Sequence, residues 1–334
     1  MPSSTFSSDA RATTPEPPSL TQPRAWMDDR RARSATIILL IGLSLILVAA
    51  ELSARYLFPK MSRIERRVVQ DEYEVMSIAE QHSSVNPTVL LLGNSLLLHG
   101  LDYPAIRAKM GPRVRVVRYT IENTEYLDWY YGLRGLFANG VKPDLVVVCL
   151  NTGQLLSHNI LDESAWRLFR AQDLVAVSRA AQMSNTEASG IFFDHLSAFY
   201  ASRALVRNYI LNVTQPGYAE QLHALAQQPP VFPPQQEIMV GTRLRLRTLR
   251  DLCRENGSAF LLLVPPALVN RDGALLSAGA LEGVDVDAPI GIQELGQEFF
   301  LDGFHLNARG AERFTDALAR DLKLRFHRTE TFHP

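Results

Sequence analysis

Cysteine is scarce in this sequence, and neither sign of charge is in excess. The 334 residues include only two cysteines, Cys149 and Cys253, too few for a disulfide scaffold or a cysteine-rich zinc module. Lysine and arginine total 34 against 35 aspartates and glutamates, which argues against a general nucleic-acid binder because such proteins carry a basic excess. Glycine and proline, at 19 each, are too few for a collagen-like or wholly disordered chain. With 46% hydrophobic residues, the chain is long enough to bury one large core or two smaller ones.

Large apolar residues are nearly absent from the first 23 positions, which are rich in proline, serine and threonine. Such a segment buries too little surface to offset the entropy lost on ordering it. We therefore predict a disordered cytoplasmic tail over residues 1–34.

The composition then changes abruptly, because residues 35–50 (ATIILLIGLSLILVAA) carry no charge. As a helix they would be about 24 Å long, slightly less than the ~30 Å hydrocarbon core of a bilayer. A cleaved signal peptide is one alternative, but Glu51 and Arg55 follow directly and no cleavage site is evident. A buried core helix is another, but it would normally include polar positions. We predict an uncleaved transmembrane anchor over residues 35–54 and a helical linker over 55–86.

Charge does not decide the orientation of this anchor. The nearby basic residues nearly tie across it: Arg24, Arg30, Arg31 and Arg33 come before, and Arg55, Lys60, Arg63 and Arg66 come after. A short N-terminal tail followed by a large C-terminal body is typical of a signal-anchor. We expect a single-pass protein of the cytoplasmic (inner) membrane with its C-terminal body outside the cytoplasm, in the periplasm.

From Pro87 onward, short apolar runs alternate with helical patterns. The pattern predicts strands over residues 88–92, 114–119, 143–150 and 259–264, and helices over 103–110, 124–139, 243–256 and 308–326. This alternation is typical of a doubly wound α/β fold with a parallel sheet covered on both faces. We predict one such domain over residues 87–326, followed by a tail at 327–334. Residues 155–237 do not fit the alternation, and we interpret them as a helical insertion packed over the functional edge of the sheet, in the position of a lid.

Three polar features follow predicted strands or precede the last helix, at the sheet edge where open parallel sheets bind ligands. In Gly93-Asn94-Ser95 the glycine permits a sharp turn, and the serine then begins a helix whose N–H groups favour negative charge. Asp302 precedes His305 by three residues, so its carboxylate can hold one imidazole nitrogen while the other takes a proton from Ser95. Asn151, after the third strand, is a side-chain donor for an oxyanion.

The segment TVLLLGNSLLLHGLD, followed roughly 200 residues later by DGFHLNARGAERF, resembles the first and last sequence blocks of the SGNH/GDSL hydrolase superfamily. The resemblance covers residues 87–154 and 240–326 and implies a flavodoxin-like α/β/α sandwich. It also implies that Ser95 is the nucleophile, His305 the general base and Asp302 the residue that orients the imidazole. The motif Gly93-Asn94-Ser95, with an anchor ahead of it, is similar to that of membrane-tethered members associated with envelope polysaccharides. Some of those members transfer acyl groups.

The chain departs from the family pattern at three places. The usual aspartate of the first block is Asn94, which keeps capping capacity without the charge. The second-block glycine, an N–H donor to the oxyanion, falls near Asn123. The third block normally ends Gly-x-Asn-Asp, but here reads Asn151-Thr152-Gly153-Gln154, so its asparagine is displaced by two residues. The implied oxyanion donors are therefore Ser95, Asn123 and Asn151. His99, near Ser95, follows three leucines on a predicted helix, and we interpret it as structural.

These features predict a serine acyl-ester hydrolase or O-acyltransferase that acts on an extracytoplasmic glycan or similar ester. The altered third block leaves open a catalytically impaired protein that binds a glycan or scaffolds an envelope complex. The anchor and the apolar insertion leave open a lysophospholipase. The sequence has no metal-ligand spacing, no phosphate-binding loop and no dinucleotide fingerprint, so we expect no metal, no cofactor and no nucleic-acid partner. Envelope biosynthesis proteins are the expected partners.

Overall fold

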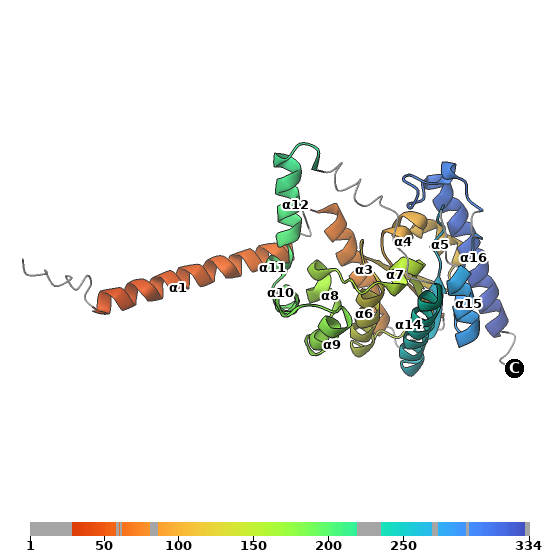
Figure 1. Ribbon diagram of the computed structural model, residues 1–334, viewed down its shortest axis with the longest axis horizontal. Helices are drawn as coiled ribbons and strands as arrows, with labels where there is room; N and C mark the ends of the chain where they lie inside the picture. Colours follow the sequence, from red (N-terminus) through yellow and green to blue (C-terminus); the bar gives the residue numbers. More distant parts are fainter. Residues whose placement is uncertain are drawn as a thin grey trace, which may run out of the picture. The chain divides into compact units, whose positions relative to one another are not determined.

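The computed structural model describes residues 29–57, 60, 62–80, 86–218, 235–268, 273–291 and 294–330 (Figure 1). Most of the predicted N-terminal tail, the proline-rich end of the insertion and the last four residues lie outside this range. The chain divides into two units, Met1–Ala49 and Ala50–Pro334.

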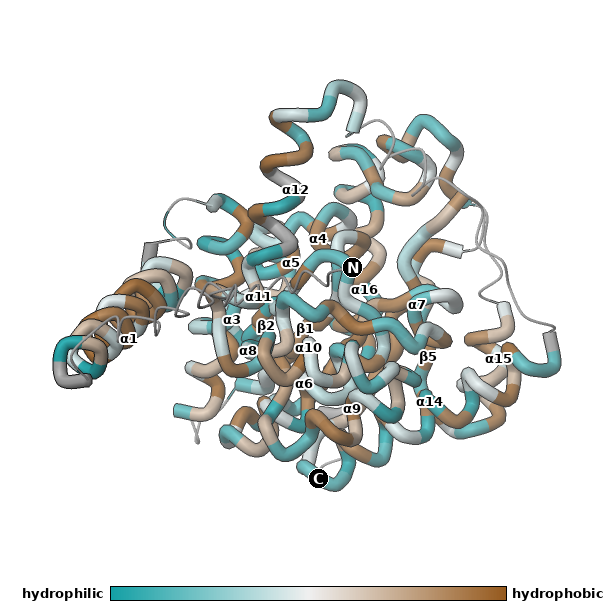
Figure 2. Tube along the Cα trace, turned by 60° about the vertical axis from the view of Figure 1, so that its left-hand side comes forward, coloured by the Kyte–Doolittle hydropathy of each residue, from teal (hydrophilic) through white to brown (hydrophobic). Residues whose placement is uncertain are grey.

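The first unit holds most of helix α1 (Asp29–Leu52), which contains the uncharged run. The segment Arg31–Tyr56 has a mean hydropathy of 2.5 and is the one candidate membrane span among the described residues. Its apolar side chains are exposed, and Figure 2 colours much of α1 brown. A helix that is apolar all round suits lipid rather than water, which agrees with the predicted anchor. A short π-helical turn, η1 (Ser53–Leu57), follows it.

The second unit is built on a five-stranded parallel sheet in the order β2-β1-β3-β4-β5. This is the flavodoxin-like order, and it confirms the predicted fold class. The strands are β1 (Thr88–Gly93), β2 (Arg115–Thr120), β3 (Leu145–Cys149), β4 (Ala259–Leu263) and β5 (Asp285–Asp287). The first four match predicted strands, whereas β5 was not predicted.

Helices cover both faces of the sheet and separate its core into two clusters. One face packs against α3 (Arg63–Glu80), α6 (Tyr126–Ala138), α14 (Gln235–Glu255) and α15 (Gly273–Glu282). The other packs against α4 (Ser95–Gly100), α5 (Tyr103–Met110) and α16 (Ala308–Glu330). Along β1, Leu90 and Leu92 enter the first cluster and Val89 and Leu91 the second, as the two-residue period of a strand requires. The strand is therefore apolar throughout.

Two helices extend beyond the predicted limits. Helix α14 begins at Gln235, eight residues before the predicted start, and α16 continues to Glu330, into the predicted tail. Gly257, after α14, has φ +80°, the left-handed conformation that glycine commonly adopts just beyond the end of a helix.

Helix α3 lies within the predicted linker, yet it is part of the body. Val68, Val75 and Ile78 are buried in the first core cluster, and the helix packs on β2. The apolar positions recur at helical spacing, so one face of α3 covers the edge of the sheet.

The described part of the insertion adds short helices beside α6. They are α7 (Thr152–Leu156), η2 (Asp162–Ser164), α8 (Ala165–Leu168), η3 (Ala171–Asp173), α9 (Leu174–Ala180), α10 (Asn185–Leu196), α11 (Ala198–Ala201) and α12 (Arg203–Thr214). Helices α8 and α9 pack on α6, and Leu168, Val177 and Ile191 join the first core cluster. These contacts extend the helical layer on that face of the sheet, and the interpretation as a lid stays a prediction.

Candidate active site

The turn after β1 fixes Ser95 at the start of α4. A side chain at Gly93 would bring its Cβ within 2.8 Å of Leu97 Cβ and 3.2 Å of Cys149 Cβ, so only glycine lets α4 approach the strand this closely. Asn94 is buried, and its Oδ1 caps the helix by accepting a hydrogen bond from the Leu96 N–H at 3.0 Å. Ser95, in the first turn, is half-buried.

The loop before α16 is a tight turn centred on Asp302. Its Oδ1 accepts hydrogen bonds from the backbone N–H groups of Phe304 (3.0 Å) and His305 (2.8 Å). Gly303 has φ +86°, a conformation that favours glycine. An antiparallel bridge between Phe300 and Leu306 closes the turn at its base. The sequence Asp-Gly-Phe-His therefore folds back locally and holds the imidazole beside the carboxylate.

The structure brings Ser95, His305 and Asp302 together. His305 Nδ1 lies 2.8 Å from Asp302 Oδ2, and His305 Nε2 lies 3.0 Å from Ser95 Oγ. Partial burial favours a higher pKa for Asp302, but hydrogen bonds from the side chain and backbone of His305 and from the Phe304 N–H outweigh it and lower the pKa to about 2.

This ionisation state fixes the tautomer of His305. An ionised carboxylate only accepts hydrogen bonds, so Nδ1 carries the proton and the Nε2 of the neutral ring accepts from the Ser95 hydroxyl. A hydroxyl, an imidazole and a carboxylate linked in this order can activate the hydroxyl as a nucleophile.

His99 also reaches this group, one helical turn after Ser95. Its ring lies edge-on to the ring of His305, with a centroid distance of 5.1 Å. Partial burial, and then the neighbouring His305, lower the pKa of His99, so its neutral form is favoured. The contact agrees with a structural role that packs the imidazole of His305.

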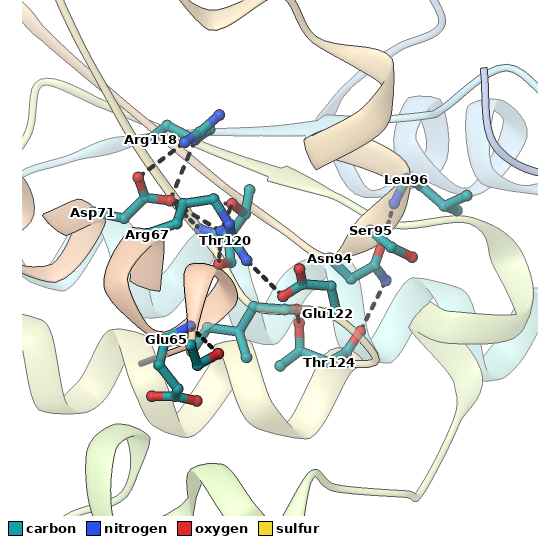
Figure 3. A network of polar contacts seen from close by, with 12 residues as sticks. Glu65, Arg67, Asp71, Asn94, Ser95, Leu96, Arg118, Thr120, Glu122 and Thr124 are labelled. Atoms are coloured by element: carbon teal, nitrogen blue, oxygen red, sulfur yellow. Dashed lines mark hydrogen bonds and ion pairs between the residues drawn. The ribbon is translucent and has the colours of Figure 1, made fainter. Parts of the chain in front are cut away.

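Asn123, the second predicted oxyanion donor, lies in the loop after β2 with φ 60°. This left-handed conformation is one that glycine adopts most easily, which agrees with the resemblance placing a glycine near this position. Asn94 ties the loop to the serine turn, since its Nδ2 donates to the Thr124 carbonyl at 2.9 Å (Figure 3). Asn94, which stands where the family's first block has an aspartate, thus links the two loops.

Helix α3 holds the other side of this loop through polar residues that sequence reasoning missed. Arg67 donates to the Thr120 carbonyl at 2.7 Å and to the Glu122 carboxylate at 2.6 Å (Figure 3). Asp71, which is buried, accepts hydrogen bonds from Arg118 and Thr120. The one available signal was a charged pair at (i, i+4) spacing on an amphipathic helix, and that pattern is more typical of a solvated face.

Asn151, the third predicted donor, caps α7. Its Oδ1 accepts from the Gln154 N–H at 2.9 Å, and the Gln154 side chain accepts from the Asn151 N–H at 3.2 Å. Gly93 of β1 pairs with Cys149 of β3, and these two strands are adjacent and parallel. Ser95 and Asn151 each follow their paired residue by two positions. With the backbone N–H and Oδ1 engaged, Nδ2 is the donor that remains for an oxyanion.

A largely apolar cavity of about 210 Å³ borders Asn123. Its lining includes Val68 of α3, Ile121 directly after β2, and Ala198 and Ala201 of α11. It places an apolar volume beside one of the predicted oxyanion donors. Within the described ranges, no group of three or more His, Cys, Asp or Glu side chains is arranged to hold a metal ion.

Comparison with known proteins gives likeness in structure alone. No family model matches the chain, and no curated protein matches it. LAE5, an alpha/beta hydrolase enzyme from the metagenome of Lake Arreo in Spain, is 11% identical with a TM-score of 0.37, covering 71% of this chain and 94% of its own. TesA is 16% identical with a TM-score of 0.34, covering 71% of this chain and 98% of its own. At TM-scores this low, the fold assignment rests on the strand order of the chain itself.

Proposed function

We propose that this protein is a membrane-anchored serine acyl-ester hydrolase or O-acyltransferase. The observation that carries the proposal is the hydrogen-bonded series Ser95 Oγ to His305 Nε2 at 3.0 Å and His305 Nδ1 to Asp302 Oδ2 at 2.8 Å. These three residues come from two segments roughly 200 positions apart, so their alignment is a property of the fold rather than of local sequence.

In the proposed reaction, Ser95 Oγ attacks the carbonyl carbon of an ester while its proton passes to His305 Nε2. The tetrahedral intermediate breaks the bond to the alcohol, which leaves with the proton from Nε2, and the acyl group stays on Ser95 as an ester. Water or a sugar hydroxyl then attacks the acyl-enzyme, again losing its proton to Nε2. The second tetrahedral intermediate breaks the bond between the acyl carbon and Ser95 Oγ, which takes the proton back from Nε2 as the acid or the new sugar ester leaves. Asp302, ionised throughout, holds the imidazole in the tautomer that accepts the proton.

The backbone N–H groups of Ser95 and Asn123, with Asn151 Nδ2, are the proposed donors to the negatively charged oxygen of the intermediate. Ser95 stands in the first turn of α4, where N–H groups have no partner within the helix. Each such donor typically contributes 10²- to 10³-fold to kcat, about 2.7–4 kcal/mol.

The cavity beside Asn123 would receive the acyl group. In an Ala201→Leu variant the added carbons would occupy part of this volume. Wild type and variant are compared on activated esters of increasing acyl length. A loss confined to the longer esters supports the assignment, whereas an equal loss at every length contradicts it.

The substrate is proposed to be an extracytoplasmic glycan ester, with the body held at the periplasmic face of the inner membrane by α1. The supports are the apolar run of α1 and the resemblance of the serine turn to tethered envelope proteins. Burst kinetics on acetyl-sugar esters and on lipid esters, measured side by side on the full chain in detergent, test the substrate class. A burst with the sugar esters that Ser95→Ala abolishes supports the proposal, and a burst with lipid esters alone favours a lysophospholipase.

A catalytically impaired glycan-binding or scaffold protein is the second candidate. The observation that favours it is the displaced third-block asparagine, whose Oδ1 is engaged as the cap of α7. If a fluorophosphonate probe leaves the folded protein unlabelled while it still binds glycan, this second function replaces the first.

A further inference from the structure

Helices α10, α11 and α12 present a group of exposed apolar side chains within a short segment. Eight large apolar residues between positions 192 and 213 are at least 38% exposed: Phe192, Phe193, Leu196, Phe199, Tyr200, Val206, Ile210 and Val213. We call them the α10–α12 apolar surface. Figure 2 shows brown segments along α12 between teal ones. Single exposed apolar residues are normal on a protein surface, but here Phe193 contacts both Phe192 and Tyr200, and exposed apolar residues that gather in this way are a candidate interaction site.

This surface is tied to the point where the apolar run of α1 ends. Glu51, the residue after that run, accepts hydrogen bonds from the Ser197 hydroxyl at 2.7 Å and from the N–H groups of Ala198 and Phe199 at 3.1 Å each. The carboxylate of Glu51 therefore occupies the N-terminus of α11. Five of the eight apolar residues lie within eight positions of Ser197 along the chain.

Glu51 follows the apolar run directly within helix α1. A helix advances 1.5 Å per residue, so the end of the uncharged run and Glu51 differ by only about 1.5 Å along the axis of α1. If the run spans the hydrocarbon core, Glu51 lies at its boundary, and α11, bonded to Glu51, lies there too. An apolar surface at that depth meets the interface between acyl chains and headgroups.

The side chains of the surface suit this environment. Tyr200 is aromatic with a polar hydroxyl at one end, and such side chains concentrate at membrane interfaces, while Phe199 beside it adds apolar area. A groove of about 400 Å³ along α11 and α12 is lined by Phe199, Val206 and Ile210, with Arg203 and Arg207 beside them. Arg207 is exposed, and a guanidinium next to apolar side chains can bind a lipid phosphate while its stem packs on the acyl region.

We infer that the α10–α12 apolar surface docks on the lipid bilayer at the interface, so that the body is held against the membrane by this surface as well as by α1. The inference needs the apolar run to span the membrane, but it does not depend on the chemistry of Ser95. A second copy of this chain, or another segment of the same chain, would be the competing occupants.

The two native cysteines allow a direct test, because Cys149 and Cys253 are fully buried. A cysteine introduced at an exposed position can therefore be labelled selectively with bimane in the full-length protein. The test positions are Phe193→Cys and Ile210→Cys on the surface. Leu324→Cys on α16, which is 57% exposed, is the matched control, and Leu43→Cys within the apolar run is the positive control. Each variant is placed in nanodiscs without doxyl lipids, and in nanodiscs whose lipids carry the doxyl quencher either near the headgroup or deep in the acyl chain.

We expect the doxyl lipids to quench the labels at positions 193 and 210 at least half as strongly as the label at position 43, and to leave the label at position 324 unchanged. Labels at 193 and 210 that behave like the label at 324, while the label at 43 is quenched, would overturn the inference. A blue-shifted emission of these two labels without doxyl quenching would also overturn it. If the blue shift depends on protein concentration, a second copy of the chain covers the surface. If the shift does not depend on concentration, another segment of the same chain covers it. An unquenched label at position 43 would remove the membrane span and the inference with it.

Discussion

Two neighbouring turns at the sheet edge have the same local structure but different surroundings. The strands β1 and β3 are adjacent and parallel, and each is followed by an asparagine N-cap and then a hydroxyl residue: Asn94 with Ser95, and Asn151 with Thr152. Both asparagines also accept a backbone hydrogen bond from the residue four positions on.

The difference lies in what surrounds each hydroxyl residue. Ser95 is half-buried and its Oγ lies 3.0 Å from His305 Nε2, whereas Thr152 is 1% exposed. Asn94 uses its amide to bond the next loop, whereas Asn151 is paired with Gln154 in a capping box. A strand-turn-helix with a hydroxyl at its start is thus only a scaffold, and the loop that delivers His305 distinguishes the Ser95 turn from the Thr152 turn.

Substituting the hydroxyl residue of each turn is the strongest test of this comparison. Ser95→Ala should lower kcat by roughly 10⁶-fold, because loss of the nucleophile leaves only the binding and oxyanion contributions. Thr152→Ser, the matched variant, should keep kcat within a few-fold and cost about 1 kcal/mol for the lost buried methyl. Steady-state kinetics on an activated ester, with thermal unfolding as the check of folding, would test both. Equal losses in the two variants would refute the assignment of Ser95.

The orientation of the imidazole should have the next largest effect. Asp302→Asn keeps the size of the side chain but lets His305 adopt the other tautomer, and we expect a loss in kcat of roughly 10⁴-fold. The measurement is kcat at neutral pH for wild type and variant. A loss below tenfold would show that Asp302 does not orient His305 during the reaction.

The amide of Asn151 separates capping from oxyanion binding. Asn151→Asp retains an oxygen that can cap α7 but removes the Nδ2 donor, so we expect a 10²- to 10³-fold lower kcat with little change in stability. Asn151→Ala should show a similar kinetic loss and also lose about 0.5–2 kcal/mol of stability, because the cap disappears. Unchanged kinetics in both variants would exclude this amide as a donor.

The matching change in the other turn should act on stability. Asn94→Asp restores the acidic residue of the resembling family, but here it removes the donor to the Thr124 carbonyl and buries a carboxylate. We expect a loss of about 1–3 kcal/mol in the free energy of unfolding. Chemical denaturation of the two proteins would measure it, and a variant as stable as wild type would show that the bond between the two loops contributes nothing.

The smallest expected effect is a pH dependence carried by Asp302. Its pKa in the folded protein is about 2, below the ordinary value of about 3.9, so the ionised form stabilises the fold above pH 4 and this contribution is lost as pH falls through about 2. The stability difference between wild type and Asp302→Asn should be constant from pH 8 to pH 5 and shrink towards pH 2. Thermal unfolding at a series of pH values measures it, and a difference that grows on acidification would contradict the cause given for the shift.

Sequence patterns predicted most of this fold because its central strands are apolar on both faces. Strand β5 was missed since Asp285–Asp287 is short and polar, and only its pairing with β4 at the sheet edge makes it a strand. The sequence predicts a linker where α3 lies, because α3 stabilises the fold through contacts with β2 that no local pattern reveals. The candidate residues Ser95, Asp302 and His305 could be named from the sequence, since each belongs to a locally encoded turn. The contact of His99 with His305 was not, because it depends on where a distant loop lies.

The central claim is that the Ser95 hydroxyl is activated by His305, and a fluorophosphonate probe tests it most directly. The full-length wild type, Ser95→Ala and Thr152→Ser are treated with the probe in detergent, and the modified peptides are mapped by mass spectrometry. We expect a single adduct on Ser95 in wild type and Thr152→Ser, and none in Ser95→Ala. A folded wild-type protein that stays unlabelled, or an adduct that persists at another residue in Ser95→Ala, would contradict the claim.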